Sequence, residues 1–393
     1  MTHPNPARPW LVLFGLTLGV CVTNGFARFA YGVILPAMKQ DLGWSYAQAG
    51  WLNTANALGY IVGAIVTLWL ITQFTPARLF SLGVITTSFF LLFTGLTDAL
   101  WLQSVWRALA GVFGAISFIT GGALAAALFQ DNPKNNALAI ALYFGFGGGL
   151  GIVLSGAALP LMLDTWGPSS WPYAWIAVGI TCLVFTPPSV WAAEHLRPPT
   201  SKARPKADVP MLRMLGVIAG YAGFGMGYIV YLTFLVAWMR AHDFSAGIVS
   251  GIWVLLGTFI TLSPFVWRSV FARFASGLPL AMILTCIAIG SVLPVLMPTA
   301  TGLILSAMVF GLSVFMSPGA ITNFTRQNLP PASWGAALTR FTIVFAIAQT
   351  VSPIAAGIIG DITGDIGDSI VVAAGVLLLG AVFALMQKPL DTV

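Results

Sequence analysis

The chain has 393 residues, of which 58% are hydrophobic and only 7% charged, and its mean hydropathy is +0.92. Soluble domains carry about 25% charged residues, so this composition excludes a soluble globular protein and indicates a polytopic membrane protein. The net charge of +6 does not require a nucleic-acid partner, because lysines and arginines serve membrane proteins as topology signals. The apolar runs are continuous rather than alternating, which excludes a β-barrel.

Twelve apolar stretches are long enough to cross a bilayer, since a spanning helix needs about 20 residues. The sequence therefore predicts an all-α integral membrane protein with twelve transmembrane helices in two six-helix halves. The predicted helices cover residues 10–37, 46–73, 77–96, 99–129, 136–163, 171–192, 213–239, 245–267, 277–297, 301–324, 335–360 and 369–387.

One connection differs from the others in composition. Residues 193–212 are polar, Pro-rich and basic, as expected of a linker. They divide the chain into an N-terminal half, 1–192, and a C-terminal half, 213–393. If this linker is cytoplasmic, nearly all loop lysines and arginines lie on its side, and the opposite side receives only Lys39 and Arg240. This bias predicts a protein of the bacterial inner membrane with both termini in the cytoplasm.

Arg28, Arg107 and Arg340 lie within predicted spans, whereas no Asp, Glu, Lys or His does. A charged side chain at the bilayer centre costs at least roughly 2.5–3.5 kcal/mol, so it usually faces a partner or a polar cavity. Positive charge without an acid to pair with it indicates a site for an anion. The expected substrate is a small organic anion, in particular a monocarboxylate.

The first predicted helix carries a polar track. Asn24, Arg28 and Tyr31 stand at i, i+4 and i+7, a spacing that places side chains on one helix face. Arg28 lies about ten residues before Met38, which marks the outer end of the helix. It is therefore roughly 15 Å from that end. Its planar guanidinium can bond both oxygens of a carboxylate, which favours substrate binding. Bonding to backbone carbonyls and snorkelling to the interface remain alternatives.

Two further helices carry polar side chains that could line the same cavity. The second helix has Asn53, Asn56 and Tyr60, and the seventh has Tyr228 and Tyr231. Tyrosines can both donate a hydrogen bond and form an apolar wall. Polar residues in membranes also commonly bond neighbouring helices, so a purely structural role stays open for both groups.

Other residues are candidates for conformational roles. Arg107 is expected to bond neighbouring helices in one transport state, with substrate contact as the alternative. Arg340 lies only about five residues into its predicted helix, and could either contact substrate or reach the interface. Gly145, Gly148 and Gly149 are expected to permit close packing and bending of the fifth helix.

The sequence predicts no cofactor and no metal site. Cys21, Cys182 and Cys286 are far apart, and the histidines lie in the tail or loops. The sequence shows no nucleophile and base in a catalytic arrangement, so it does not indicate an enzyme. A co-transported proton, exchange of substrates and facilitated diffusion all remain open, because no carboxylate or histidine lies within a span. Asp361, at the outer end of the eleventh helix, is expected to be a solvated loop residue.

Several stretches resemble the major facilitator superfamily. Residues 107–115, RALAGVFGA, are similar to its Arg-x-x-x-Gly-x-x-x-Ala pattern, and the glycines of 145–151 resemble its antiporter motif without the central proline. The loop 72–78, between the second and third predicted helices, lacks the acid of the superfamily's Gly-x-x-x-Asp-Arg-x-Gly-Arg pattern. Residues 25–38, GFARFAYGVILPAM, resemble the YbfB/YjiJ-type branch, with Ala27 in place of a glycine. The resemblance implies a transporter without implying a substrate.

Taken together, these patterns predict a secondary active transporter that moves a small organic anion across the inner membrane. It would act as a monomer and alternate access by rocking its two halves about a central cavity. The alternative is a multidrug or metabolite efflux antiporter of the same superfamily, suggested by the glycine-rich fifth helix and the aromatic content. A transporter-like membrane sensor is a more remote alternative.

Overall fold

The computed structural model describes residues 8–129, 132–196, 209–330 and 333–390. Within these ranges there are twelve helical spans that are long and apolar enough to cross a membrane, and no strand. This confirms the predicted all-α membrane fold. Most of the predicted linker, residues 197–208, lies outside the described residues.

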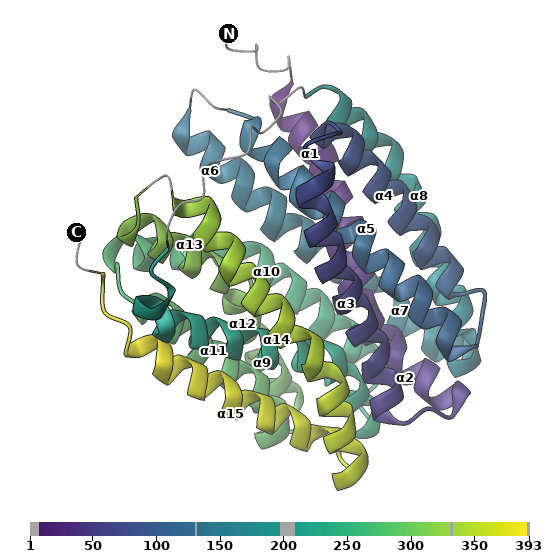
Figure 1. The fold of residues 1–393 in the computed structure, drawn as a ribbon. Coiled ribbons are helices and arrows are strands. Elements are labelled where there is room, and N and C mark those ends of the chain that lie inside the picture. The colour runs from purple at the N-terminus through teal and green to yellow at the C-terminus, as the bar shows by residue number, and fades with distance from the viewer. Residues whose placement is uncertain (1–7, 130–131, 197–208, 331–332, 391–393) are drawn as a thin grey trace.

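The first six spans occupy one side of the molecule, drawn from purple to teal in Figure 1. The first and fifth spans are each built from three consecutive helical segments. The bounds are α1 (Pro9–Val20), η1 (Cys21–Ala30) and α2 (Tyr31–Leu42); α3 (Tyr46–Leu70); α4 (Pro76–Thr94); α5 (Leu100–Ala127); α6 (Pro133–Ala141), η2 (Leu142–Phe146) and α7 (Gly147–Trp166); and η3 (Pro168–Ser170) with α8 (Trp171–Glu194).

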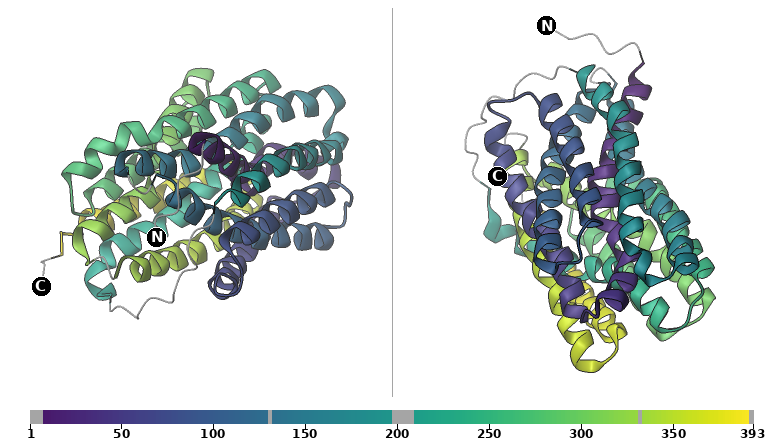
Figure 2. Two further views of the ribbon diagram at one scale, coloured as in Figure 1. Left: turned by 90° about the horizontal axis from the view of Figure 1, so that it is seen from above. Right: turned by 90° about the vertical axis from the view of Figure 1, so that its right-hand side faces the viewer.

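The last six spans occupy the other side, drawn from teal-green to yellow, and the view from above in Figure 2 shows the same separation. Their bounds are η4 (Met211–Met214) with α9 (Leu215–Ala241), α10 (Ala246–Arg273), α11 (Leu278–Leu296), α12 (Ala300–Val314) with α13 (Ser317–Asn328), α14 (Trp334–Thr363) and α15 (Ile366–Leu385). Because the number of spans is even, the first begins on the face where the last ends. We call this the terminal face and the opposite one the distal face.

The first span is not a regular α-helix. Its middle segment, η1, is a π-helix, a wide-turned form that is rare and occurs frequently at functional sites. Gly25 in this segment packs against the fifth span so closely that an added Cβ would lie 2.8 Å from the Cα of Gly151. The wider turn also changes the face that each side chain of the segment occupies.

Small residues bring the helix backbones close together elsewhere. Between α3 and α5, a Cβ added to Gly59 would overlap the carbonyl oxygen of Ala108, and one added to Gly63 would overlap that of Val112. Such contacts are typical of membrane helices, whose association depends on close packing. The α3–α5 pair is therefore a fixed unit of the first half.

We predict that Gly59→Ala lowers the stability of the protein. The new methyl group must push α3 away from Ala108, and overpacking of this kind costs about 1–3 kcal/mol. Thermal unfolding of the purified protein in detergent measures the effect. Gly251→Ala in α10 is the control, since its added Cβ would meet no atom within 4 Å. Equal melting temperatures for the two variants would contradict the packing argument.

Candidate functional site

A buried polar cluster lies near the middle of the bundle. Arg28 in η1 is only 9% exposed. Its Nη2 donates to Oε1 of Gln349 in α14 at 2.6 Å and to the hydroxyl of Tyr228 in α9 at 3.1 Å. The Tyr228 hydroxyl also donates to Oε1 of Gln349, at 2.9 Å. The cluster thus joins the first span to two spans of the other half.

Among the described residues, Arg28 contacts neutral groups only. The ring of Tyr60 lies 5.1 Å from its Cζ, a distance suited to a cation–π contact. In the described part of the chain no carboxylate lies within 4.0 Å of Arg28. The Nε2 of Gln349 is buried without a hydrogen-bond partner there. The cluster therefore combines a net positive charge with an unused donor, an arrangement that can accept an anion.

Aromatic rings extend from this cluster toward the terminal face. Tyr221, Phe224 and Tyr228 of α9 stack with Phe345 of α14. The interplanar angles of these stacked pairs are 25° or less. The tightest pair is Phe224 and Tyr228, whose ring centroids are 4.5 Å apart. This wall is apolar apart from its two hydroxyl groups. Its three α9 rings are buried, at 5% exposed or less, and they form the apolar side of the cluster.

Arg107 lies outside this cluster, fully buried in α5. Its Nη1 donates to the carbonyl of Ala27 at 2.7 Å, next to Arg28 in the chain. The rings of Tyr31 and Trp175 lie 5.0 and 5.3 Å from its Cζ. Arg107 is therefore placed to fix the backbone that carries Arg28, and its expected conformational role stays a prediction.

The remaining polar candidates of the sequence analysis bond neighbouring helices. Tyr31 does not share the surroundings of Arg28, because the π-helical turn between them separates their faces. The bonds run from Tyr31 Oη to the Ala49 carbonyl at 2.6 Å, from Asn53 Nδ2 to Thr233 Oγ1 at 2.6 Å, from Asn56 Nδ2 to the Arg107 carbonyl at 3.0 Å, and between Tyr231 Oη and Ser306 Oγ at 2.6 Å.

The glycines of the fifth span lie at its contact with α10 and the first span. A Cβ added to Gly149 would lie 2.8 Å from the Gly257 carbonyl oxygen, and one added to Gly148 would lie 3.6 Å from Nδ2 of Asn24. Gly145 is looser, since its added Cβ would meet only Pro264, at 3.7 Å. Asn24 itself is buried beside this run.

Arg340 lies apart from the cluster. Its side chain is on the surface near the terminal face, where Nη1 donates to the carbonyl of Val209 at 3.0 Å. Sequence reasoning missed Gln349 as a partner of Arg28. The signal that could have found it is a lone amide in the middle of a long apolar span.

The distal face is closed by contacts between the halves. Asp361, at the end of α14, accepts hydrogen bonds from the backbone N–H groups of Tyr46 at 2.7 Å and Ala47 at 2.9 Å. These are the first residues of α3, whose N–H groups have no partner within their own helix. The helix dipole adds to the attraction for a carboxylate. Asp361 thus connects the two halves at the distal face; it is exposed, as we expected, but it lies within α14 and not in a loop.

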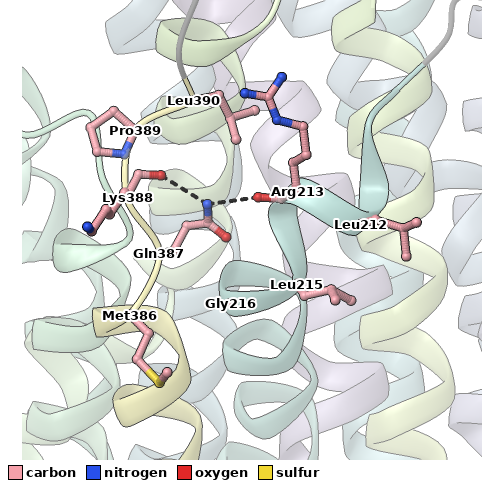
Figure 3. A pocket seen from close by; sticks show the side chains of 9 residues that line it. All are labelled: Leu212, Arg213, Leu215, Gly216, Met386, Gln387, Lys388, Pro389 and Leu390. Atoms are coloured by element: carbon pink, nitrogen blue, oxygen red, sulfur yellow. Dashed lines mark hydrogen bonds between the residues drawn. The ribbon is translucent and has the colours of Figure 1, made fainter.

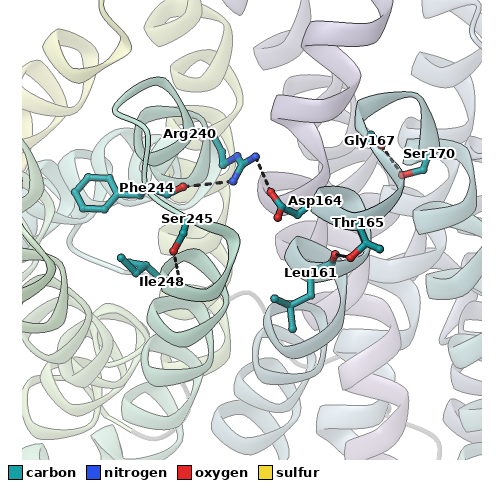
Figure 4. A network of polar contacts seen from close by, with 9 residues as sticks. All are labelled: Leu161, Asp164, Thr165, Gly167, Ser170, Arg240, Phe244, Ser245 and Ile248. Atoms are coloured by element: carbon teal, nitrogen blue, oxygen red, sulfur yellow. Dashed lines mark hydrogen bonds and ion pairs between the residues drawn. The ribbon is translucent and has the colours of Figure 1, made fainter.

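Three further contacts support this closure, and the bond from Asn53 to Thr233 described above is one of them. Thr54 in α3 donates to the carbonyl of Thr350 in α14 at 2.8 Å. Arg240 in α9 pairs with Asp164 in α7 at 3.1 Å, as Figure 4 shows. Both charged side chains are about half exposed, so this ion pair contributes little to stability. The buried bonds of Asn53 and Thr54 therefore contribute more to the polar closure, and Asp361 adds two exposed ones.

We predict that Asp361→Asn opens the distal face. The variant loses the charge and one of two acceptors. Because Asp361 is exposed, solvent screening limits the lost contribution to about 1 kcal/mol, so the distal-open population should rise about fivefold. Spin labels at Gln40→Cys and Ile362→Cys report the separation, with the native cysteines replaced by alanine. Asp365→Asn is the control, since Oδ1 of Asp365 accepts from the N–H of Gly367 at the start of α15, in the same half of the protein. Unchanged distances in Asp361→Asn would contradict its role in the closure.

Twelve spans arranged in two groups around a buried polar cluster define a membrane transporter of the major facilitator type. The chain belongs to the family described as "Uncharacterised MFS-type transporter YbfB", whose model matches residues 20–385. It is accordingly a multi-pass membrane transporter and not an enzyme.

Solved structures share this fold over nearly the whole chain. A bacterial homologue of the human lysosomal transporter Spinster, in an inward-facing and occupied conformation, is 17% identical with a TM-score of 0.74, covering 98% of this chain and 97% of its own. A D-xylose–proton symporter is 12% identical with a TM-score of 0.75, covering 98% of both chains. At these identities the likeness concerns the fold alone.

One curated relative is similar over a shorter stretch. A "Putative metabolite transport protein" of Haemophilus influenzae is 28% identical over 166 residues. The match covers 42% of this chain and 39% of that relative. The chain thus matches about two fifths of the relative's length.

Proposed function

We propose that this protein is a secondary active transporter of a small organic anion, in particular a monocarboxylate, and that Arg28 is the ligand of the carboxylate. The observation that carries the proposal is a buried arginine in mid-membrane whose partners are all neutral. The name of the Haemophilus influenzae relative supports a metabolite as substrate.

The chemistry of the cluster suits an exchange of partners. A guanidinium bonds a carboxylate through two parallel hydrogen bonds, which are about twice as strong as bonds between neutral groups. A bound anion would replace the amide oxygen of Gln349 as the acceptor for Arg28. The Nε2 of Gln349 and the hydroxyl of Tyr228 would then donate to the same anion. Binding would thus satisfy a donor that lacks a partner.

The same bonds connect substrate binding to alternating access. Arg28 belongs to the half 1–192, and Tyr228 and Gln349 belong to the half 213–393. An anion held by all three would link the halves while they rock about the centre. The contacts of Asp361 and Thr54 close the distal face in this conformation. We assign the distal face to the outside and both termini to the cytoplasm of a bacterial inner membrane.

Transport would be driven by a gradient of the substrate, or of a proton that the substrate carries, and not by protonation of a carboxylate of the protein. Among the described residues that contact Arg28 there is no acid or histidine to take up a proton. Charge balance would then come from exchange of one anion for another, or from a proton carried on the substrate's own carboxyl group. The transporter would act as a monomer, since one chain supplies the complete cluster.

A second candidate is efflux of an amphipathic molecule by an antiporter. The observation in its favour is the aromatic wall formed by Tyr221, Phe224, Tyr228 and Phe345. The two candidates differ in the charge they expect of the ligand. An anion is favoured at Arg28, whereas drug cations would be repelled there.

We predict that one class of small carboxylates raises the melting temperature of the purified protein and that Arg28→Ala abolishes the effect. Saturation at about 100 times the dissociation constant stabilises a protein by about 2.7 kcal/mol. Arg28→Lys keeps the charge but loses the planar fork, so it should retain only a small part of the shift. Stabilisation by cationic drugs, or an anion effect unchanged in Arg28→Ala, would support the efflux alternative.

We further predict that Gln349→Glu mimics the bound anion. The variant has nearly the same shape, but places a carboxylate where the amide oxygen now accepts from Arg28 at 2.6 Å. The basal melting temperature should rise and the affinity for added carboxylates should fall at least tenfold, as titration by thermal shift can measure.

Gln349→Leu is the control for this variant, since it removes the amide without adding charge. It should leave Arg28 able to bind a carboxylate, although the protein will be less stable because a buried donor loses its acceptor. Wild-type affinity in Gln349→Glu would contradict the role of this cluster.

A further inference from the structure

A pocket of about 330 Å³ lies on the terminal face, away from the central cluster. It is formed where η4 and the start of α9 meet the segment that follows α15 (Figure 3). Its lining begins at Leu212 and Arg213 on one side and ends at Lys388 and Leu390 on the other. The pocket thus joins the two ends of the second half at the membrane boundary.

The floor of the pocket is held by one buried amide. Nε2 of Gln387 donates to the carbonyl of Arg213 at 3.0 Å and to that of Lys388 at 2.9 Å. The backbone carbonyl of Gln387 accepts from the N–H of Gly277, at the start of α11, at 3.0 Å. These bonds connect η4, the segment after α15 and the start of α11, so the pocket is held in shape by the fold.

The apolar lining of the pocket is unusually exposed. Leu212 is 83% exposed, Met386 71% and Leu215 56%. Leu212 and Leu215 lie at the start of one membrane span and Met386 directly after the end of another, where we expect the acyl chains of lipids to meet their headgroups. Apolar side chains at this depth are stable because a lipid chain, rather than water, covers them.

Two cations lie beside this apolar surface. Arg213 and Lys388 are exposed, and in Figure 3 their charged ends stand on either side of the Gln387 side chain. In the described ranges of the chain, neither has a carboxylate within 4.0 Å. Basic pockets between transmembrane helices are suited to anionic headgroups.

We propose that this pocket binds a membrane phospholipid with a net negative headgroup. Arg213 and Lys388 would contact the phosphate-bearing headgroup, and Leu212, Leu215 and Met386 would contact the first part of an acyl chain. A free phosphate ion would satisfy the cations but leave the apolar surface uncovered. The combination of charge and exposed apolar area therefore favours the lipid over the ion.

The test measures lipid binding to the full chain in a neutral detergent. Phosphatidylglycerol, phosphatidylcholine and inorganic phosphate are titrated separately, with binding followed by native mass spectrometry. We expect phosphatidylglycerol to bind most tightly. The pair Arg213→Gln and Lys388→Gln should weaken its binding about twenty-fivefold, because each basic residue at the membrane surface contributes about fivefold.

Two further variants make the result specific. Arg78→Gln with Arg268→Gln removes the same charge from exposed positions outside the pocket, and should leave the affinity nearly unchanged. Arg213→Lys with Lys388→Arg keeps the charges and should retain binding, which separates loss of charge from misfolding. Equal binding of phosphatidylcholine, equal binding of inorganic phosphate, or an equal loss in the Arg78 and Arg268 pair would overturn the proposal.

Discussion

The arrangement depends on a positive charge that the membrane interior cannot solvate. An arginine at this depth needs acceptors, and Arg28 obtains them from a tyrosine and an amide on the opposite half. The surrounding groups hold it in this position. The π-helical turn sets its direction, and Arg107 bonds the carbonyl of Ala27 just before it. A neutral solvation shell of this kind can be exchanged for an anion.

Polar contacts between the first half and α14 lie at two levels. At the centre, Arg28 meets Gln349 and Tyr228. Toward the distal face, Thr54 and Asp361 connect α3 with α14. Both levels involve α14, so a tilt of this helix relative to α3 would affect the distal closure and the cluster together. This shared helix gives a physical route by which binding at the centre can influence access at the distal face.

The sequence was sufficient for the fold, and it named Arg28 as a candidate. Continuous hydropathy predicts all twelve spans, and Arg28 is one of the arginines within the predicted ranges, which contain no acid. Pairings over long separations could not be predicted in this way. Gln349 and Asp361 find partners 321 and 315 positions away in the chain, and a single sequence without a fold gives no signal for such contacts.

Local geometry also limited the prediction. Placing Tyr31 on the face of Arg28 assumed 3.6 residues per turn, which a π-helix does not have. Tyr31 therefore lies away from the central cluster. Its hydroxyl donates to the carbonyl of Ala49, and its ring contacts the guanidinium of Arg107. Arg340 was considered for the cavity because it interrupts an apolar span, but it lies close enough to the terminal face to bond Val209.

The most direct test of the account is an experimental structure of the protein in a lipid nanodisc with the carboxylate that stabilises it most. The account predicts carboxylate oxygens about 2.7–2.9 Å from the guanidinium nitrogens of Arg28, with Oε1 of Gln349 displaced from Nη2. A structure in which Arg28 keeps its bonds to Gln349 and Tyr228, while the anion binds elsewhere, would contradict it.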